Sequence, residues 1–342
     1  MSALPAPPTA AVITRGDGVD AWHAAAAAIV DGDGRVTHAL GDPELVTFTR
    51  SAIKPLQALP LCLTGARDAL AIDDEELALA AASHDGTDVH RAIAARLLAK
   101  AGAGAEQLLC GAHWPIGMRL AGRHPCAGED RDPLRHNCSG KHAGFLAVAR
   151  VLGVAPERYL DPDSEVQRAV KRAVADACEI PEASLRTGTD GCSAPNFGMP
   201  LASLARGFKN LATRGSSSAP LDAALARVRA AMQAHPQLVS GEARFDHDLA
   251  RAFGARIVSK GGAEALQAIG FSDPPIGIAV KVLDGGERAL APICLAVLAA
   301  LGLLVSAPPP SLAHRVRPAI TNHRGVETGA IVATVELQRL RG

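Results

Sequence analysis

Extended sequence patterns at the two ends of the chain enclose a long middle part with helical periodicity, and this arrangement limits the possible folds most strongly. Near the N-terminus, residues 20–30 and 35–40 flank the turn sequence DGDG at residues 31–34. The alanines of the first run favour a helix, but a turn of Gly and Asp between two apolar runs is typical of a β-hairpin. We therefore predict two strands here.

The middle of the chain has the pattern of a helical unit. Apolar residues recur at helical spacing from residue 51 to about residue 109, with interruptions at Gly65 and at residues 83–87. The same spacing predicts further helices at residues 141–152, 164–178 and 221–235.

Strand patterns return in the C-terminal third. Strands are predicted at residues 277–283, 288–291 and 330–337, with an apolar helix at residues 291–305. Because strands occur at both ends and helices between them, we expect an α+β fold. In this fold an antiparallel sheet formed by the N- and C-terminal segments, about 10–50 and 255–342, is packed with helices. A mainly helical half spans about 51–254, and the whole chain is expected to form one domain.

Composition and charge exclude several classes of protein. Lys+Arg 35 balance Asp+Glu 35, so the chain lacks the basic field that nucleic acid binding needs. The apolar stretch at residues 291–305 is shorter than the ~20 residues that cross a bilayer, and residues 1–5 lack the positive charge of a signal peptide. The seven cysteines include no C-x-x-C pair, which indicates reduced core residues. We expect a cytoplasmic protein without a nucleic acid or membrane partner.

A Ser-x-x-Lys sequence stands at the start of the helical middle. Its spacing places Ser51 and Lys54 on one face of a helix. A serine hydroxyl becomes a nucleophile when a base takes its proton, and lysine is such a base once its pKa falls from ~10.4 to about 7–8. Penicillin-recognising acyl transferases use the same arrangement. The alternative is that Ser51 caps the helix and that Lys54 is a solvated charge.

Two further segments carry a serine or a lysine next to small residues. Ser83 and His84 lie in the sequence ASHDG, which interrupts an apolar helix and would expose both side chains in a loop. Lys260 ends a strand-like run, and Gly261 and Gly262 then leave room where a substrate could approach. Alternatively, the first segment is a capped helix start and the second is a surface turn with an exposed lysine.

The densest group of reactive side chains is the sequence RHNCSGKH at residues 135–142. Cys and His ligands suit zinc, and the DGCSAP sequence at residues 190–195 could supply a distant ligand, although the spacing fits no standard zinc finger. A competing interpretation makes Cys138 a catalytic thiolate whose pKa is lowered by His136 and His142. A third is a polar loop that caps the following helix.

Taken together, these segments resemble the thermolabile, rhizobial type of bacterial L-asparaginase, the L-asparaginase II family. The matching segments are RSAIKPLQALP (50–60), ASHDG (82–86), RHNCSGKHAG (135–144), DGCSAP (190–195), HPQLVSGEARFD (235–246), SKGGAE (259–264), GIAVK (277–281) and NHRG (322–325). They follow the order of the family along almost the whole chain. The resemblance implies a homodimer and a fold similar to serine β-lactamases and glutaminases, which agrees with the α+β pattern.

The site residues that the resemblance implies fall into three groups. The catalytic residues form two Ser–Lys pairs, Ser51 with Lys54 and Ser83 with Lys260. The residues of an adjacent zinc site are Cys138, Lys141 and Cys192. The residues that contact substrate are Arg50, His142 and Asp190.

The implied activity is the hydrolysis of L-asparagine to L-aspartate and ammonia. Three lysines in one cleft raise each other's cost of carrying charge, so at least one should be neutral near pH 7 and act as a base. We expect Lys54 to accept the Ser51 proton as this serine attacks the side-chain carbonyl. The Ser83–Lys260 pair then relays a proton to the departing ammonia, and water hydrolyses the acyl ester.

Substrate anchors and zinc assist this scheme. The α-carboxylate and α-amine of asparagine need one positive and one negative anchor, for which Arg50 and Asp190 are the candidates. Because lysine must lose its proton to bind zinc, we expect the metal to aid orientation or affinity and not to activate water. Thr87 stands where the family has glutamate, and the Ser193-Ala194 pair is also unusual. Both departures bear on substrate affinity and on the preference for asparagine over glutamine.

Two other functions fit parts of the pattern. A glutaminase or a β-lactam-recognising acyl transferase would use the same Ser51–Lys54 pair. A non-catalytic amino-acid or zinc-binding protein would keep only the scaffold. Because a pure binder has no need of two nucleophile–base pairs, the retention of all four Ser and Lys residues favours an enzyme.

Overall fold

The computed structural model describes residues 7–125, 131–213, 215–216, 218–242, 244–304 and 307–340. The N-terminal residues 1–5 and the predicted end of the apolar helix at residue 305 lie outside this part of the chain. Among the described residues, no helix combines the length and the apolar character that crossing a membrane would require.

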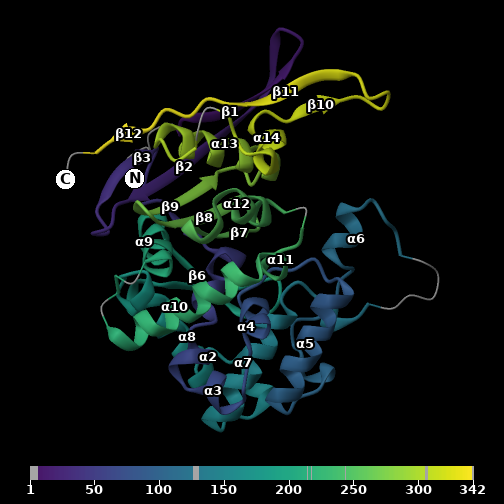
Figure 1. Cartoon of the computed structure of the whole chain (residues 1–342), viewed down its shortest axis with the longest axis vertical. Helices are drawn as coiled ribbons and strands as arrows, with labels where there is room; N and C mark the ends of the chain where they lie inside the picture. Colours follow the sequence, from purple (N-terminus) through teal and green to yellow (C-terminus); the bar gives the residue numbers. More distant parts are fainter. Residues whose placement is uncertain are drawn as a thin grey trace.

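A nine-stranded sheet joins the two ends of the chain (Figure 1). Its main path runs in the order β10-β11-β1-β2-β9-β8-β7, and β3 pairs with β2 and β12. The strands are β1 (Thr9–Arg15), β2 (Gly18–Val30), β3 (Val36–Leu40), β7 (Ile257–Gly262), β8 (Leu266–Ser272), β9 (Pro275–Val282), β10 (Ala319–Thr321), β11 (Glu327–Ala333) and β12 (Gln338–Arg339). All pairings are antiparallel, which confirms the predicted α+β class and the predicted β2–β3 hairpin.

Small residues on β2 allow helices to pack closely on both faces of this sheet. Ala26 and Ala28 belong to the core shared with the helical half, whereas Ala27 and Ile29 belong to the core on the opposite face. Successive side chains of a strand point to opposite faces, so a continuous apolar run indicates a strand that is buried on both sides.

Helices cover both faces. α9 (Leu201–Ala212) packs against β8 and β9 on the side of the helical half. It lies so close that a Cβ added at Gly277 would be 2.0 Å from the Ala205 carbonyl oxygen. α13 (Glu287–Ala300) packs on the opposite face, and α12 (Phe245–Phe253) packs against the edge strand β7.

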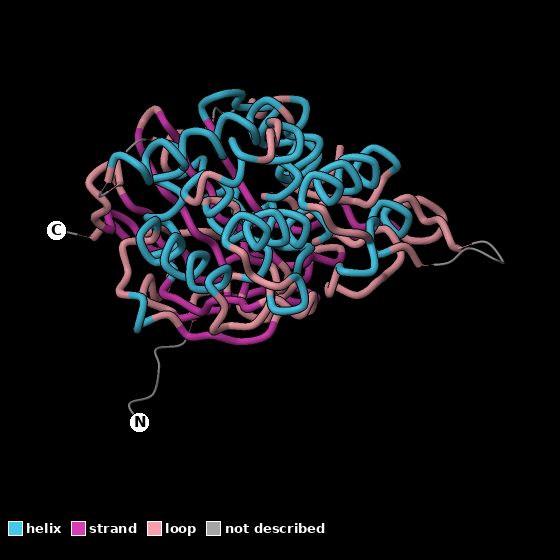
Figure 2. Tube along the Cα trace, turned by 90° about the horizontal axis from the view of Figure 1, so that it is seen from below, coloured by secondary structure: helices cyan, strands magenta, loops and turns pink. Residues whose placement is uncertain are grey.

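The helical half is built around α7 (Ser139–Leu152), which contacts α4, α5 and α8. Residues 139–149 of α7 are all buried. Figure 2, viewed from below, shows the helices of this half in front of the strands. The other helices are α1 (Lys54–Gln57), α2 (Pro60–Leu63), α3 (Ala66–Ala69), α4 (Asp74–Ala80), α5 (Asp88–Ala101), α6 (Ile116–Leu120), α8 (Glu165–Ala177), α10 (Ala219–Ala234), α11 (Pro236–Val239) and, beside α12 and α13, α14 (Pro310–Val316).

A small sheet interrupts the region that we predict to be helical. Its order is β4 (Val46–Phe48), β6 (Pro195–Pro200) and β5 (Arg186–Thr189). These strands have three to six residues, and β4 pairs with a segment that is distant in sequence. Short strands of this kind leave little periodicity to read.

Two predictions in the C-terminal third are wrong in detail. Residues 288–291 belong to α13 and not to a strand, because they continue directly into alanines and leucines that favour a helix. The last predicted strand is shorter, since β11 ends at Ala333 and the two-residue β12 follows separately.

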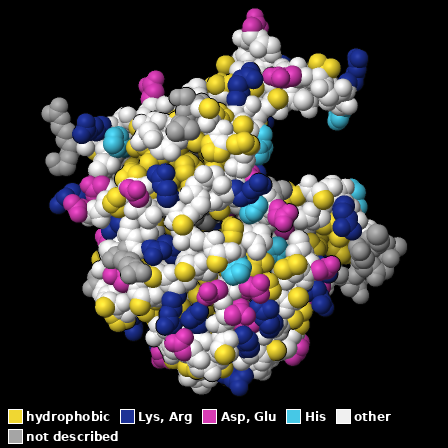
Figure 3. Space-filling model, in the orientation of Figure 1, with side chains coloured by type: hydrophobic (Ala, Val, Ile, Leu, Met, Phe, Trp, Pro, Cys, Tyr) yellow, Lys and Arg dark blue, Asp and Glu magenta, His cyan; other side chains and the backbone are white. Residues whose placement is uncertain are grey.

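Charges of both signs are mixed on the surface. On the face shown in Figure 3, Lys and Arg side chains alternate with Asp and Glu over the lower, helical half. This distribution agrees with the balanced composition. It gives this face no patch of a single sign of the kind that steers a nucleic acid.

Candidate active site

The turn that carries Ser51 is tied to the small sheet. Thr49 donates both its backbone N–H and its hydroxyl to the Phe197 carbonyl at 2.9 Å, and the Arg50 N–H donates to Asn196 Oδ1 at 3.2 Å. Arg50 itself has φ 47°, in the left-handed region that non-glycine residues rarely adopt. Backbone strain of this kind persists where the surroundings hold it, which is frequent at functional sites.

Neither alternative reading of the Ser-x-x-Lys sequence describes this turn. Ser51 lies within a 3₁₀ turn at Arg50–Ile53 whose N-cap position is Thr49, so it does not cap the helix. Lys54 begins α1 and is fully buried instead of solvated.

Asn137 connects residues of the two Ser–Lys pairs. Lys54 Nζ donates to the Asn137 carbonyl oxygen at 3.1 Å, and Asn137 Nδ2 donates to Ser83 Oγ at 2.9 Å. The other end of the amide, Oδ1, lies 3.0 Å from His113 Nε2. Asn137 therefore links Lys54 of the first pair to Ser83 of the second. Its place between His136 and Cys138 in the sequence does not reveal this contact.

Ser83 occupies the predicted loop between α4 and α5, but this loop is not exposed. Its N–H donates to the Val239 carbonyl at 2.9 Å, and the side chains of Ser83 and His84 are both buried. The left-handed Gly86 lets the loop turn against the chain at Arg135, because a Cβ there would lie 2.5 Å from the Arg135 carbonyl oxygen. The buried His84 has a pKa well below its ordinary value because burial disfavours the imidazolium.

Lys260 reaches the same region from the edge strand β7. It is fully buried, and its Nζ donates to the Gly261 carbonyl at 2.7 Å and lies 3.4 Å from Asp246 Oδ2. Burial lowers its pKa to about 8. Asp246 opposes this change, whereas the charges of Lys54 and Arg244 add to it. Among the lysines with a shifted pKa, Lys260 therefore loses its charge closest to neutral pH.

The glycines after Lys260 serve the packing of the protein itself. A Cβ at Gly262 would lie 2.9 Å from the Thr49 carbonyl oxygen and 3.3 Å from the Ser51 N–H nitrogen. The end of β7 therefore lies directly against the turn that carries Ser51. The expectation that these glycines leave room for substrate is replaced by this close approach of two backbones.

The hydroxyl groups of the two pairs make no direct contact with their lysines. Among the described residues, no hydrogen bond joins Ser51 to Lys54 or Ser83 to Lys260; both amines donate to backbone carbonyls instead. Catalytic hydrogen bonds commonly tighten only once substrate is bound. The roles of the four residues stay a prediction; Lys54, Ser83 and Lys260 are buried, and Ser51 is half-buried.

Three buried groups next to this cluster match the predicted zinc ligands. Lys141 Nζ donates to Cys192 Sγ at 3.1 Å, and Cys138 lies within reach of both. Hydrogen bonding to Cys192 lowers the pKa of Cys138 far below its ordinary value, and the charges of Lys54 and Lys141 lower it further although burial opposes them. No group of three or more His, Cys, Asp and Glu residues suited to a metal occurs in the described ranges, so a lysine would have to complete this set.

His142 lies beside the cysteines and lines neither of the clefts described below. Tyr159 Oη accepts the Leu109 N–H at 2.8 Å and lies 2.7 Å from His142 Nδ1, so its hydroxyl proton is directed to that nitrogen. Nε2 is buried without a hydrogen-bond partner in the described part of the protein. Burial lowers the pKa of His142 to about 4, against the influence of Cys192. Its predicted contact with substrate stays a prediction.

Arg50 and Asp190 meet at a cleft of about 580 Å³. Arg50 Nε donates to Asp190 Oδ1 at 2.9 Å, and the same oxygen accepts the Gly191 N–H at 2.8 Å. Burial would raise the pKa of Asp190, but Lys141, the Gly191 amide and Arg50 hold it below its ordinary value. Glu264 and other polar residues complete the rim; the remaining charged ones are Lys281 and Asp284.

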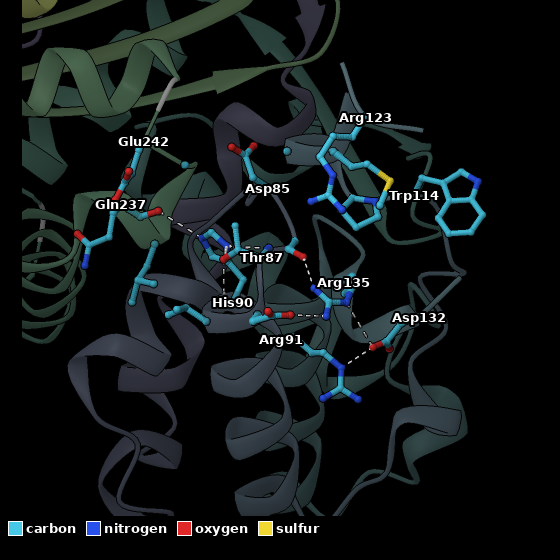
Figure 4. A pocket seen from close by; sticks show the side chains of 18 residues that line it. Asp85, Thr87, His90, Arg91, Trp114, Arg123, Asp132, Arg135, Gln237 and Glu242 are labelled. Atoms are coloured by element: carbon cyan, nitrogen blue, oxygen red, sulfur yellow. Dashed lines mark hydrogen bonds and ion pairs between the residues drawn. The ribbon is translucent and has the colours of Figure 1, made fainter. Parts of the chain in front are cut away.

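A second cleft of about 930 Å³ is lined in part by Asp85, Gly86 and Thr87, which follow Ser83 in the loop (Figure 4). Its charged side chains are largely paired with one another: Arg91 and Arg135 both contact Asp132, and Asp85 accepts from Arg244 at 3.1 Å. Although this cleft is larger, the smaller one is lined by both predicted anchors, Arg50 and Asp190. That these two residues bind substrate stays a prediction.

The comparisons with known proteins agree with the sequence motifs. The family model described as L-asparaginase II matches residues 11–333. The protein is thus an enzyme of the amidohydrolase class. The chain belongs to the L-asparaginase II family.

Solved structures show more distant similarity. The native form of Mglu is similar over 82% of this chain with 13% identity and a TM-score of 0.46, and this chain spans 65% of the length of that one. A β-lactamase from Mycobacterium bovis is similar over 81% of this chain and 94% of its own, with 17% identity and a TM-score of 0.43. No curated protein matches the chain.

Proposed function

We propose that this enzyme hydrolyses L-asparagine to L-aspartate and ammonia through an acyl ester on Ser51. The observation that carries the proposal is the buried arrangement in which Asn137 joins Lys54 to Ser83, while β7 places Lys260 behind the Ser51 turn. Two buried lysines, the buried Ser83 and the half-buried Ser51 suit an acyl transfer that needs both a base and an acid.

In the first step Lys54 takes the Ser51 proton as the hydroxyl oxygen attacks the side-chain carbonyl carbon. The C–N bond then breaks, and the nitrogen leaves as ammonia after it receives a proton through Ser83 and Lys260. A pKa of about 8 suits this second duty, because Lys260 is then mostly an ammonium near neutral pH and still releases its proton easily. In the second step water cleaves the ester and restores the Ser51 hydroxyl.

Recognition of the amino acid is assigned to the Arg50–Asp190 cleft. Arg50 presents a guanidinium for the α-carboxylate, and Asp190, which keeps its charge at neutral pH, faces the α-amine. The rim carries Glu264 and Lys281 as well, so charges of both signs are available for a zwitterion. A substrate with only one charge would leave part of this rim unpaired.

Zinc fits the residues present. Cys138, Lys141 and Cys192 would hold it through two thiolates and one amine, and the unpartnered Nε2 of His142 lies in the same buried group. When bound, zinc supplies a fixed positive charge beside the cleft that orients Asp190 and its neighbours. Without zinc, the Lys141 ammonium provides the positive charge next to the two sulfurs. Burial would lower the pKa of Lys141, but Cys192 and Cys138 outweigh burial and raise it.

The test is ammonia release by the purified protein from asparagine and from glutamine, with hydrolysis of a chromogenic β-lactam in parallel. Ser51→Ala is compared with Ser203→Ala, which removes a buried hydroxyl on α9 outside the cluster. We expect asparagine to be the best substrate, Ser51→Ala to lose activity and Ser203→Ala to keep it. Turnover of the β-lactam without ammonia release would contradict the proposal, and so would an active Ser51→Ala variant.

A further inference from the structure

Asp246 is a buried carboxylate with an unusually complete set of donors. It lies in the first turn of α12 and is 8% exposed. The groups around it are Ser259 Oγ at 3.1 Å, Gln267 Nε2 at 2.8 Å, the Gly261 N–H at 2.9 Å and Lys260 Nζ at 3.4 Å. Burial alone would raise its pKa, but Lys260 and these donors hold it below the ordinary value, so the group is a carboxylate at neutral pH.

The same short segment also holds the loop of Ser83. Arg244, two residues before Asp246, contacts Asp85 Oδ1 at 3.1 Å. A Cβ at Gly241 would lie 1.9 Å from Asp85 Oδ2, so the backbone of this segment packs against that carboxylate. Gly241 and Arg244 therefore contact the Ser83 loop through Asp85, and Asp246 contacts the Lys260 amine.

The charges that face Lys260 are few and come from three elements. Lys54 at the start of α1 and Arg244 before α12 are positive, whereas Asp246 on α12 and the more distant Asp85 are negative. Asp246 is the one carboxylate among them in contact with Nζ. The positive neighbours favour loss of the Lys260 proton, and Asp246 favours its retention.

We propose that Asp246 is a positioning residue of the second pair, and that it holds Lys260 as an ammonium which gives its proton, through Ser83, to the departing nitrogen. This inference rests on the proposed amide hydrolysis. It divides the work between the two lysines. Among the described residues Lys54 contacts no carboxylate, and it takes a proton, whereas Lys260 contacts Asp246 and gives a proton.

The charge of Lys260 determines how activity should depend on pH. Lys260 can donate only while it is protonated, so activity falls as the pH rises through its pKa of about 8. Asp246→Asn removes the negative charge that favours the ammonium, so this alkaline limb should move to lower pH by about one unit or more. Gln267→Leu removes a donor from the carboxylate but keeps both charges. The carboxylate becomes more basic, and the limb should move slightly to higher pH.

The matched control is Asp248→Asn. Asp248 lies on the same helix and is 7% exposed, but its carboxylate pairs with Arg315 at 2.6 Å on the far side from Lys260. This variant loses a comparable buried ion pair without touching the second Ser–Lys pair. It should unfold more easily than the wild type and should keep the position of the alkaline limb.

The experiment records kcat for asparagine from pH 5 to pH 10 for the wild type and the four variants Asp246→Asn, Asp246→Glu, Gln267→Leu and Asp248→Asn. A shift of the alkaline limb to lower pH for Asp246→Asn, a small opposite shift for Gln267→Leu and no shift for Asp248→Asn support the inference. An alkaline limb that stays in place overturns it. An acid limb that moves to lower pH, with higher activity in acid, also overturns it because Lys260 would then act as the base. Asp246→Glu keeps the charge and should keep the limb even where kcat falls.

A second readout separates this inference from the proposed function. The chain has seven lysines, so 13Cε labelling of lysine gives a simple NMR spectrum in which Lys260 is assigned by Lys260→Arg. Its titration midpoint should fall in Asp246→Asn and not in Asp248→Asn. If the wild type releases no ammonia from asparagine, the proposed function fails, whereas the NMR titration still decides whether Asp246 sets the charge of Lys260.

Discussion

The two Ser–Lys pairs use the same residue types in different surroundings. Ser51 and Lys54 come from one turn, and Lys54 donates to a neutral carbonyl. Ser83 and Lys260 come from a loop and an edge strand that are far apart in sequence, and Lys260 contacts a carboxylate. The same functional groups therefore have different neighbours in the two pairs, and we propose that this difference lets one site hold both a base and an acid.

The largest expected effect is on the first pair. Ser51→Ala should lower kcat for asparagine by roughly a thousandfold or more, because no acyl ester can form. It should lower the hydrolysis of an activated β-ester of aspartate to the same degree, since this substrate also needs the nucleophile. Ammonia release and ester hydrolysis are measured side by side, and intact-protein mass spectrometry should detect no acyl adduct. An adduct on the variant would show that another nucleophile, Cys138 first, does the work.

The second pair should respond differently to the same two substrates. Ser83→Ala should lower ammonia release from asparagine by about a hundredfold, the usual scale of a lost proton transfer. The activated ester should be nearly spared, because its leaving group departs without a proton. Equal losses with amide and ester would contradict the division of labour between the pairs. Circular dichroism of the variant checks that the buried loop around Ser83 is intact.

Asn137, which links the two pairs, should have a smaller effect on activity, and this effect should depend more on the substrate. Asn137→Ala keeps the backbone carbonyl that accepts from Lys54 but removes the amide that donates to Ser83. We expect about a tenfold loss with asparagine and little loss with the ester, following the second pair. Asn210→Ala on α9, which removes a fully buried amide bonded to the Ala177 carbonyl, should lower the free energy of unfolding without this selectivity. A loss on both substrates would place Asn137 with the first pair instead.

The first Ser–Lys pair is easier to predict from the sequence than the second, for a physical reason. Ser51 and Lys54 are visible because their contact follows from helical spacing, just as the β2–β3 hairpin follows from its turn residues. Lys260 and the segment of Cys192 stand out in the sequence, but only the family resemblance pairs Lys260 with Ser83 and names Cys192 as a ligand, because nothing local to them indicates what they approach. Asp246 and Arg244 lie inside a matching motif, yet their partners depend on how α12 packs on β7. The small sheet of β4, β5 and β6 was missed for the same reason.

The predicted zinc site offers a further test of the first pair, because Lys54 interacts with Cys138, one of the predicted zinc ligands. Chelation should raise KM for asparagine severalfold and should change kcat by less than about fivefold, because the scheme needs no metal-activated water. Zinc content, measured by elemental analysis of the purified protein, should fall in Cys138→Ala. It should persist in Cys110→Ala, whose thiol is also buried and whose pKa burial raises to about 12.

The effects of chelation on KM and on kcat together show whether the metal takes part in the chemistry or only in substrate binding. If chelation abolished kcat while the pH limb set by Lys260 stayed unchanged, the chemistry at Ser51 would depend on the charge next to Lys54, and the first pair could no longer be described by lysine alone. If Cys110→Ala lost zinc as readily as Cys138→Ala, the ligand set would extend along this row of buried cysteines. A change in KM with zinc lost only from Cys138→Ala would leave Lys54 as the base and would confine the metal to the substrate anchors.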